Sequence, residues 1–390
     1  MAGPGSALTI GDLKAQARRR VPRMFADYAD GGSYTESTYR ANESDFNAIK
    51  FRQRVAVNLE DRSLRSTMLG EPVTMPVAMA PAAISGLQIA NGEILAARAA
   101  EKFGVPFTLS TMSICSIEDV AENTGRPFWF QIYVIRDKAF MERLVDRAKA
   151  AKCSALVLTM DHQIQGQRHK DVRNGLSAPP KFNVSSVMQI ATKPRWAFGM
   201  LGAKRRTFSN VVGHASGVDD LSSLSGWIKA QFDPTLTWKE VGWLKDRFDG
   251  PVVVKGVLDP EDARAAVAAG ADAVIVSNHG GRQLDGAPST IRVLPEIVDA
   301  VGGKTEVLID GGIRSGQDVL KGLALGAKGA FIGRPVLYGL GAGGEAGVTR
   351  ALDIIHAEMD TTMALLGERD VNNVGPEDIY SNDLLRRQGY

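Results

Sequence analysis

The sequence predicts an α/β protein with a (β/α)8 TIM barrel, an N-terminal helical segment and a long loop after strand 4. Eight short apolar runs recur along the chain, with helix-like segments between them. The runs are continuous rather than alternating, which is typical of parallel strands buried on both faces. Polar or ionisable residues end nearly every run, as expected where an active site lies at the C-terminal strand ends of a barrel. A doubly wound sheet is the alternative fold.

The predicted strands cover residues 76–80, 106–110, 127–133, 155–161, 252–256, 273–278, 307–311 and 330–334. Helical patterns cover 92–102, 139–151, 260–269 and 315–325. We assign 71–370 to the barrel, 371–390 to a C-terminal tail, and 1–70 to a helical extension packed on the barrel. Within the extension, 8–20 and 22–29 predict short helices, and the glycines after Asp30 end the second one.

One spacing interrupts the regular pattern, because the loop 162–251 separates the fourth and fifth strands. A connection this long is typical of an insertion or a lid. It holds four of the five tryptophans, at Trp196, Trp227, Trp238 and Trp243. In its segment 193–206, basic residues flank an apolar centre. We expect a solvated loop with its apolar face packed on the barrel, and the alternative is contact with an anionic membrane surface.

Composition excludes several classes of protein. The 390 residues carry a net charge of +2, which gives no reason to expect a nucleic-acid partner. No apolar run approaches the roughly 18 residues of a membrane span, and residues 1–20 lack the apolar core of a signal peptide. The two cysteines, Cys115 and Cys153, indicate a reducing compartment or a single disulfide. We therefore predict a cytoplasmic protein, at most peripheral on the inner face of the membrane.

The segment with the most chemical information, from Ser277 to Asp285, reads SNHGGRQLD and follows an apolar strand. His279 can take a proton near neutral pH. Arg282 can hold a carboxylate with two parallel hydrogen bonds. The two glycines between them allow the backbone to approach a ligand closely. A base and a carboxylate-binding group three residues apart predict proton abstraction from a small acid.

Two other features stand at strand ends. Lys255 ends the apolar run 252–254, where it can form a Schiff base or stabilise negative charge beside a cofactor, and an ion pair with a barrel carboxylate is the structural alternative. Glycine and arginine end the last two strands, which predicts a phosphate site there; tight turns with solvated arginines are the alternative. We predict no metal, because no histidine pair, including His162 and His169, has zinc-motif spacing.

With these residues in view, the chain resembles the FMN-dependent L-2-hydroxy-acid oxidoreductases, a family that includes glycolate oxidase, L-lactate dehydrogenase and mandelate dehydrogenase. The signature SNHGGRQ at 277–283 carries the resemblance, which extends over about residues 8–366. The runs 109–115 and 232–238 are most similar to the bacterial L-lactate dehydrogenases.

The resemblance implies roles for single residues. His279 matches the base and Asp161 its carboxylate partner. Arg282 and Tyr28 match the groups that bind the substrate carboxylate, and Arg168 matches a second arginine over the substrate site.

Tyr133 matches the tyrosine that faces the substrate hydroxyl, and Lys255 matches the lysine beside the flavin. The implied catalytic set is His279, Asp161, Tyr133, Lys255 and Arg282. The residues implied to bind FMN are Ala83, Ser110, Gln131, Thr159, Lys255, Ser277, Asp310, Gly312, Arg314, Gly333 and Arg334.

The chain departs from the family pattern in three places. His162 follows Asp161, where relatives usually carry a small residue or proline. Ala83 stands where some relatives have glycine, at a position near the flavin. Met112 replaces the aromatic residue of glycolate oxidase in the substrate pocket, and its flexible thioether suits methyl or larger aliphatic groups.

The resemblance implies oxidation of a small L-2-hydroxy acid to the 2-oxo acid, and L-lactate is the first candidate substrate. Electrons would pass to a quinone or a cytochrome, and an oxidase that uses O2 and produces H2O2 is the alternative. It also implies a homotetramer. A non-catalytic flavin or metabolite sensor is the remaining alternative, although a sensor need not keep His279 as a base.

Overall fold

The computed structural model describes residues 3–176, 184–215, 218 and 233–382. Its main sheet contains eight strands in the order β4-β11-β10-β9-β8-β7-β6-β5, and all neighbouring pairs are parallel. A parallel bridge between Met79 and Phe107 joins the two edge strands and closes the barrel. The strands are β4 Val77–Met79, β5 Thr108–Ser110, β6 Trp129–Tyr133, β7 Ala155–Thr159, β8 Val252–Val257, β9 Ala273–Val276, β10 Glu306–Ile309 and β11 Gly329–Ile332. The predicted fold class is confirmed.

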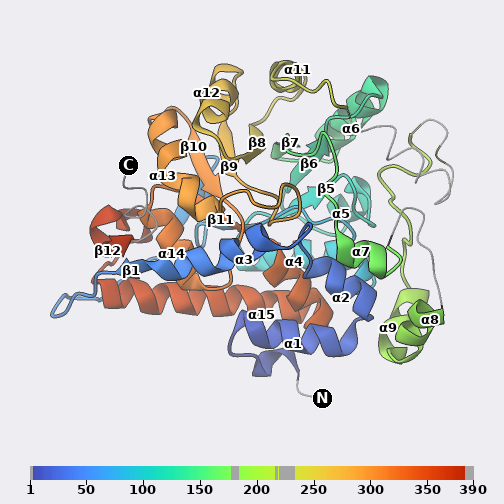
Figure 1. The fold of residues 1–390 in the computed structure, drawn as a ribbon, viewed down its shortest axis with the longest axis horizontal. Coiled ribbons are helices and arrows are strands. Elements are labelled where there is room, and N and C mark those ends of the chain that lie inside the picture. Colours follow the sequence, from blue (N-terminus) through green and yellow to red (C-terminus); the bar gives the residue numbers. More distant parts are fainter. Residues whose placement is uncertain (1–2, 177–183, 216–217, 219–232, 383–390) are drawn as a thin grey trace.

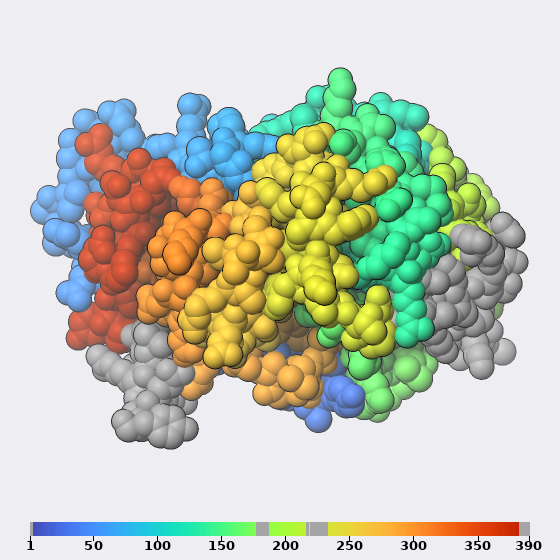
Figure 2. Space-filling view, turned by 90° about the horizontal axis from the view of Figure 1, so that it is seen from above, coloured from blue at the N-terminus to red at the C-terminus, as the bar shows by residue number. Residues whose placement is uncertain are grey.

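Helices cover the outside of the barrel (Figure 1). They are α4 Gly92–Phe103, α5 Ile117–Ala121, α6 Lys138–Ala150, α11 Lys239–Arg247, α12 Pro260–Ala268, α13 Thr290–Val301, α14 Gly316–Ala324 and α15 Arg334–Leu366. Helix α6 shows why they form: Asp137 caps its first turn by accepting a hydrogen bond from the backbone N–H of Phe140, and one face buries Phe140, Leu144 and Ala148. In Figure 2 the segments coloured orange, yellow and green lie side by side in chain order.

The strands are buried on both faces and so contribute to two apolar layers. One layer lies between the strands and the helices. The other fills the barrel, where Trp129 and Phe331 pack with ring centroids 5.7 Å apart. Met68 and Val73 reach this inner layer from the hairpin β2 Ser66–Met68 and β3 Glu71–Val73. The inner layer is therefore filled by large side chains, and the functional groups lie where the strands end.

The N-terminal extension contains η1 Pro4–Ser6, α1 Ile10–Arg20, α2 Arg23–Ala29, α3 Ser37–Ser44 and η2 Asp45–Ala48. Helix α1 packs along α15 (Figure 1). The C-terminal segment, expected to be a simple tail, contains η4 Val371–Asn373, η5 Pro376–Asp378 and β12 Ile379–Asn382. Strand β12 pairs antiparallel with β1 Ile49–Phe51, so the C-terminal segment is fastened to the N-terminal extension.

The insertion between β7 and β8, predicted as the loop 162–251, contains α7 His169–Arg173, α8 Val184–Ala191, α9 Pro194–Leu201 and the helix α11. The segment 193–206 was expected to be a loop, but it is mostly the helix α9. Trp196 of α9 stacks on Phe25 at 5.2 Å and donates a hydrogen bond to the backbone oxygen of Leu87, whereas Phe198 and Leu201 are exposed. The helix is thus packed on α2 by one face and open to solvent on another. Trp227 lies outside the described residues.

Candidate active site

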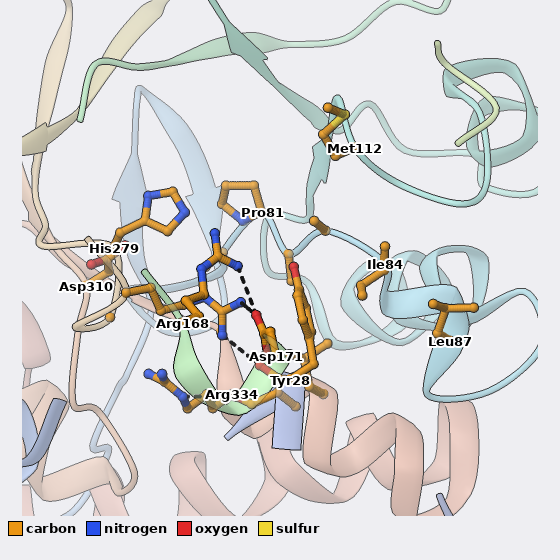
Figure 3. A pocket seen from close by; sticks show the side chains of 18 of the residues that line it. Tyr28, Pro81, Ile84, Leu87, Met112, Arg168, Asp171, His279, Asp310 and Arg334 are labelled. Atoms are coloured by element: carbon orange, nitrogen blue, oxygen red, sulfur yellow. Dashed lines mark hydrogen bonds and ion pairs between the residues drawn. The ribbon is translucent and has the colours of Figure 1, made fainter. Parts of the chain in front are cut away.

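A cavity of about 410 Å³ opens at the C-terminal ends of the barrel strands (Figure 3). Its wall takes residues from α2, from loops after the strands and from the insertion. Thirteen predicted site residues line it: Tyr28, Ala83, Met112, Tyr133, Arg168, Lys255, His279, Arg282, Asp310, Gly312, Arg314, Gly333 and Arg334. Residues from distant parts of the sequence therefore meet at one site.

His279 and Asp161 form a hydrogen-bonded pair at this cavity. Nδ1 of His279 lies 3.0 Å from one carboxylate oxygen of Asp161 and 3.3 Å from the other. A carboxylate can only accept, so Nδ1 carries the proton and Nε2 keeps a lone pair. His279 has φ of 57°, in the left-handed region that non-glycine residues rarely occupy, and the two glycines after it share this conformation. Such strain is characteristic of functional positions.

Gly256 makes room for the carboxylate of this pair. It lies at an irregularity of β8 and has φ of 108°. A Cβ atom at this position would lie 2.7 Å from Cβ of Asp161 and 2.8 Å from its Cγ. Glycine is therefore required for the loop after β7 to pass this close to β8 and bring Asp161 to His279.

Burial and charge set the protonation states of the pair. Burial raises the pKa of Asp161, but the charge and hydrogen bond of His279 outweigh this and hold it at about 2. Burial lowers the pKa of His279 below its ordinary value, although Asp161 acts in the opposite direction. At neutral pH the pair therefore consists of a carboxylate and a neutral imidazole, which is the state that a general base requires.

Two arginines and a buried carboxylate form the anion-binding part of the cavity. Nη1 of Arg282 donates to the backbone oxygens of Tyr28, at 2.6 Å, and Gly31, at 3.2 Å, and its guanidinium lies 4.5 Å from the centroid of the Tyr28 ring. Asp171 lies 3.7 Å from Arg168 and 4.0 Å from Arg282.

This cluster keeps donors available for a ligand. In the described part of the chain, Nε of Arg168 and Nη2 of Arg282 are buried without a hydrogen-bond partner. A single carboxylate faces two guanidinium groups, so the cluster carries a net positive charge. Figure 3 shows Arg168, Asp171 and Tyr28 grouped together, with Ile84 and Met112 farther from Arg168. Buried unpaired N–H groups are costly, which favours an anionic ligand such as a carboxylate at this position.

Another part of the cavity wall is mostly apolar, and the phenol of Tyr133 also lines the cavity. Met112, Ile84, Leu87 and Ile114 line it, and they suit the side chain of a substrate. Burial raises the pKa of Tyr133 well above its ordinary value. Its hydroxyl therefore stays protonated and can donate a hydrogen bond.

Lys255 makes the ion pair that was the structural alternative for it. Its Nζ lies 3.1 Å from a carboxylate oxygen of Asp310 and 2.9 Å from the hydroxyl of Ser277. Burial lowers the pKa of Lys255, but Asp310 and Asp161 outweigh this and raise it above its ordinary value. A permanently charged lysine does not form a Schiff base readily, so the cavity favours its electrostatic role.

The glycine and arginine positions of the last two strands lie in the same cavity. Arg314 pairs with Glu43 at 2.7 Å, and Arg334 donates to the backbone oxygens of Ala29 and Gly31. Gly333 precedes α15, whose N-terminus offers backbone N–H groups to an anion. The arginines are buried or half-buried rather than solvated as the alternative required.

The donors and acceptors of this region fit FMN. Asp310 Oδ1 is buried without a hydrogen-bond partner among the described residues, as expected for an acceptor that awaits hydroxyl groups. The cation of Lys255 lies beside it, and the arginines with the N-terminus of α15 provide a positive region for a phosphate.

Four predicted cofactor residues do not line the cavity and lie buried behind its wall. Gln131 donates to the hydroxyl of Thr159 at 2.9 Å, and its amide oxygen accepts from Ser110 at 3.1 Å. Ser277 accepts from Lys255. Ser110, Gln131 and Thr159 thus form a hydrogen-bonded row across three adjacent strand ends, and Ser277 is bound to Lys255 instead.

Sequence reasoning missed three residues of the site. Asp171 lies between the two arginines, and its spacing of three residues from Arg168 was the available signal. His162 lines the cavity and was dismissed for lack of a zinc pattern. The role of Gly256 could not be seen, because it depends on how close another strand end approaches.

Comparisons with known proteins agree with this geometry. The family described as "FMN-dependent dehydrogenase" matches residues 17–381. An L-lactate dehydrogenase of Ectopseudomonas mendocina (strain ymp) is 46% identical over 379 residues, which cover 97% of this chain and 98% of the relative. An L-lactate dehydrogenase of Caulobacter vibrioides (strain NA1000 / CB15N) is 47% identical over 367 residues, covering 93% and 95%.

Solved structures of similar fold point in the same direction. A monotopic membrane protein, (S)-mandelate dehydrogenase, superposes with a TM-score of 0.91 at 36% identity, covering 96% of this chain and 99% of that one. A mandelate oxidase superposes with a TM-score of 0.81 at 38% identity, covering 96% and 98%.

Proposed function

The chain belongs to the family of FMN-dependent dehydrogenases and oxidises a 2-hydroxy acid, and on this premise we propose that its substrate is L-lactate and its product the 2-oxo acid. The observation that carries the proposal is the meeting of the His279–Asp161 pair with the Arg168–Arg282 cluster at one cavity. The base and the anion-binding groups then act on one small molecule that carries both a hydroxyl and a carboxylate.

In this proposal, Arg282, Arg168 and Tyr28 bind the substrate carboxylate and so fix the orientation of C2. Tyr133 donates a hydrogen bond to the hydroxyl oxygen. Nε2 of His279 removes a proton from the substrate, and the carboxylate of Asp161 stabilises the imidazolium.

FMN, when bound, supplies the acceptor of the two electrons that leave the substrate. The side chains proposed to hold it are those of the cavity wall and of the row behind it. Lys255 would supply positive charge to the flavin ring, Asp310 would accept hydrogen bonds from the ribityl hydroxyls, and Arg314 and Arg334 would bind the phosphate.

Larger 2-hydroxy acids are a second class of substrate for the same site. Besides Met112, the apolar lining includes Ile84, Leu87 and Ile114. This apolar surface is larger than the methyl group of L-lactate can contact. Two solved structures of similar fold are of a mandelate dehydrogenase and a mandelate oxidase. L-lactate remains the first candidate substrate because the two sequence relatives named above are L-lactate dehydrogenases.

We further propose that a membrane quinone, with a cytochrome as the other candidate, takes the electrons. Phe198 and Leu201 of α9 and Val187 and Met188 of α8 are exposed apolar side chains. Such a surface suits peripheral contact with a bilayer, and a solved relative is a monotopic membrane protein. In the described part of the chain, no helix is long and apolar enough to cross a membrane. A homotetramer is the proposed assembly.

Anaerobic mixing of the FMN-loaded protein with L-lactate tests the proposal. Loss of the visible flavin absorbance would support L-lactate as the substrate, and reduction only by larger 2-hydroxy acids would replace it. If the reduced protein then recovers its colour quickly in air, the enzyme is an oxidase. If the colour returns only with a quinone analogue or an artificial acceptor, it is a dehydrogenase. Absence of reduction by every hydroxy acid would contradict the proposed function.

A further inference from the structure

His162 is a titratable side chain at the active site, and the proposed mechanism gives it no role. Its ring centroid lies 5.1 Å from that of Tyr133 and 5.3 Å from that of His279. Its exposed fraction is 8%, and it lines the cavity. It directly follows Asp161, the hydrogen-bond partner of His279. The three rings therefore form a continuous row along the wall of the cavity.

We propose that His162 is a positioning residue, an uncharged ring that fixes the imidazole of His279 relative to Tyr133 and keeps water away from it. This inference rests on the proposed role of His279 as the base. The ring contacts carry it, because His162 packs against both the base and the tyrosine proposed to face the substrate hydroxyl.

The protonation state of His162 supports this role. Burial, together with neighbouring positive groups such as Arg168, lowers its pKa to about 3, although Asp161 acts in the opposite direction. His162 is therefore neutral across the range in which enzymes work. A charged ring 5.3 Å from His279 would oppose formation of the imidazolium, whereas a neutral ring does not.

Removal of the ring has a predictable effect on the base. Burial is the largest cause that lowers the pKa of His279. If a small side chain replaced His162, water would enter beside the imidazole and weaken this effect, so the pKa of His279 would rise. The charged and titratable groups that act on His279 or pack against it are Asp161, Lys255, Arg168 and His162, and Tyr133 and Arg282 line the same cavity.

The test compares His162→Ala with His162→Phe, which retains a ring of similar size. His214→Ala is the matched control, because His214 is exposed and lies outside the cavity. We expect the rate constant of flavin reduction to fall about tenfold in His162→Ala, with a smaller change in KM, because misplacement of a base acts mainly on the chemical step. The Phe and control variants should stay within about threefold of the wild type.

The acidic limb of the pH profile of kcat/KM gives a second readout. It should move to higher pH in His162→Ala, because a base with a raised pKa is protonated over a wider range, and it should not move in His162→Phe. NMR titration of the imidazole resonances gives the same pKa without turnover. The chain has only five histidines, so loss of one resonance in His279→Gln identifies the signal of His279.

Each outcome decides the inference. It is overturned if His162→Ala reduces flavin like the wild type, if His162→Phe loses as much rate as His162→Ala, or if the pKa of His279 is unchanged in His162→Ala. Should the Ala protein not fold, His162→Gln, which also removes the ring, replaces it. A wild-type protein that no hydroxy acid reduces would instead overturn the proposed function, and the NMR titration would still decide the role of His162.

Discussion

At the scale of single residues, the proposed chemistry depends first on the imidazole of His279. We predict that His279→Gln lowers the rate of flavin reduction by about 10²- to 10⁴-fold, the usual contribution of a general base. FMN binding should be retained, because His279 contacts neither Arg314 nor the ion pair of Lys255 in the described interactions. Stopped-flow reduction and the flavin absorbance of the purified protein measure both quantities. A variant that reduces flavin at the wild-type rate would remove His279 from the mechanism.

Asp161 gives a prediction with a definite pH direction. In the wild type, kcat/KM should fall on the acid side as His279 becomes protonated, at a pH below the ordinary pKa of histidine. The carboxylate of Asp161 raises the pKa of His279, so Asp161→Asn should lower it and move the acidic limb to lower pH. The maximal rate should nevertheless fall, because the imidazolium loses its partner. A limb that moves to higher pH would contradict the assigned pair.

At the scale of elements, the irregularity of β8 at Gly256 allows a test of how Asp161 is positioned in the site. In Gly256→Ala the new Cβ would lie 2.7 Å from Cβ of Asp161, and the φ of 108° would be strained. We expect loss of stability of about 1–3 kcal/mol and a large loss of activity, seen by thermal unfolding and turnover. Gly242→Ala on α11 is the matched control, because nothing lies within 4 Å of its added Cβ. Equal effects of the two changes would show that the contact with Asp161 is unimportant.

The helix α9 gives a prediction about the membrane. Phe198→Glu combined with Leu201→Glu should weaken binding to vesicles of anionic lipid, because both exposed side chains would lose their affinity for the bilayer interior. Flavin reduction by L-lactate in solution should be unchanged, since neither residue lines the cavity. Co-sedimentation with vesicles measures the first effect. Unchanged sedimentation of the double variant would place the membrane contact elsewhere or remove it.

The helices and strands also show which structural features can be predicted from the sequence and which cannot. Eight strands were predicted close to their observed bounds because each is a continuous apolar run ended by a polar residue. Helix α9 was expected to be a loop, since its apolar face is recognisable only once Phe25 and Leu87 are in place. The pairing of β1 with β12 was also missed, because it joins residues more than 300 positions apart. His162 was noted as a departure from the family pattern, but its ring contacts were missed because ring packing leaves no spacing pattern.

At the scale of the whole molecule, Asp30 fastens the N-terminal extension to the barrel. It accepts hydrogen bonds from Tyr39 and Tyr338 and pairs with Lys14 at 2.9 Å and Arg18 at 2.7 Å. These partners come from α1, α3 and α15, so one buried carboxylate joins three helices.

Asp30 therefore makes a contribution to stability that depends on pH. Burial raises its pKa, but its partners hold it at about 2, below the ordinary 3.8. Because the folded-state pKa is depressed, the contribution is present above about pH 4 and is lost as the pH falls through about 2. Asp30→Asn should cost about 2 kcal/mol at neutral pH, with the difference from the wild type shrinking in acid. Denaturant titrations at several pH values measure this, and a difference independent of pH would contradict it.

The stack of Trp196 on Phe25 lies between the proposed membrane contact of α9 and the substrate cavity beside α2. Phe25 and Tyr28 lie three residues apart on α2, and Tyr28 holds one side of the anion-binding cluster. If α9 contacts a lipid surface as proposed, a shift of α9 would therefore act on a helix that contributes to the substrate cavity. Thermodynamic linkage makes such an influence mutual. If vesicles increase the affinity of the protein for a hydroxy acid by some factor, that acid must increase the affinity of the protein for vesicles by the same factor. The concentration of the substrate would then regulate how much of the enzyme is bound to the membrane.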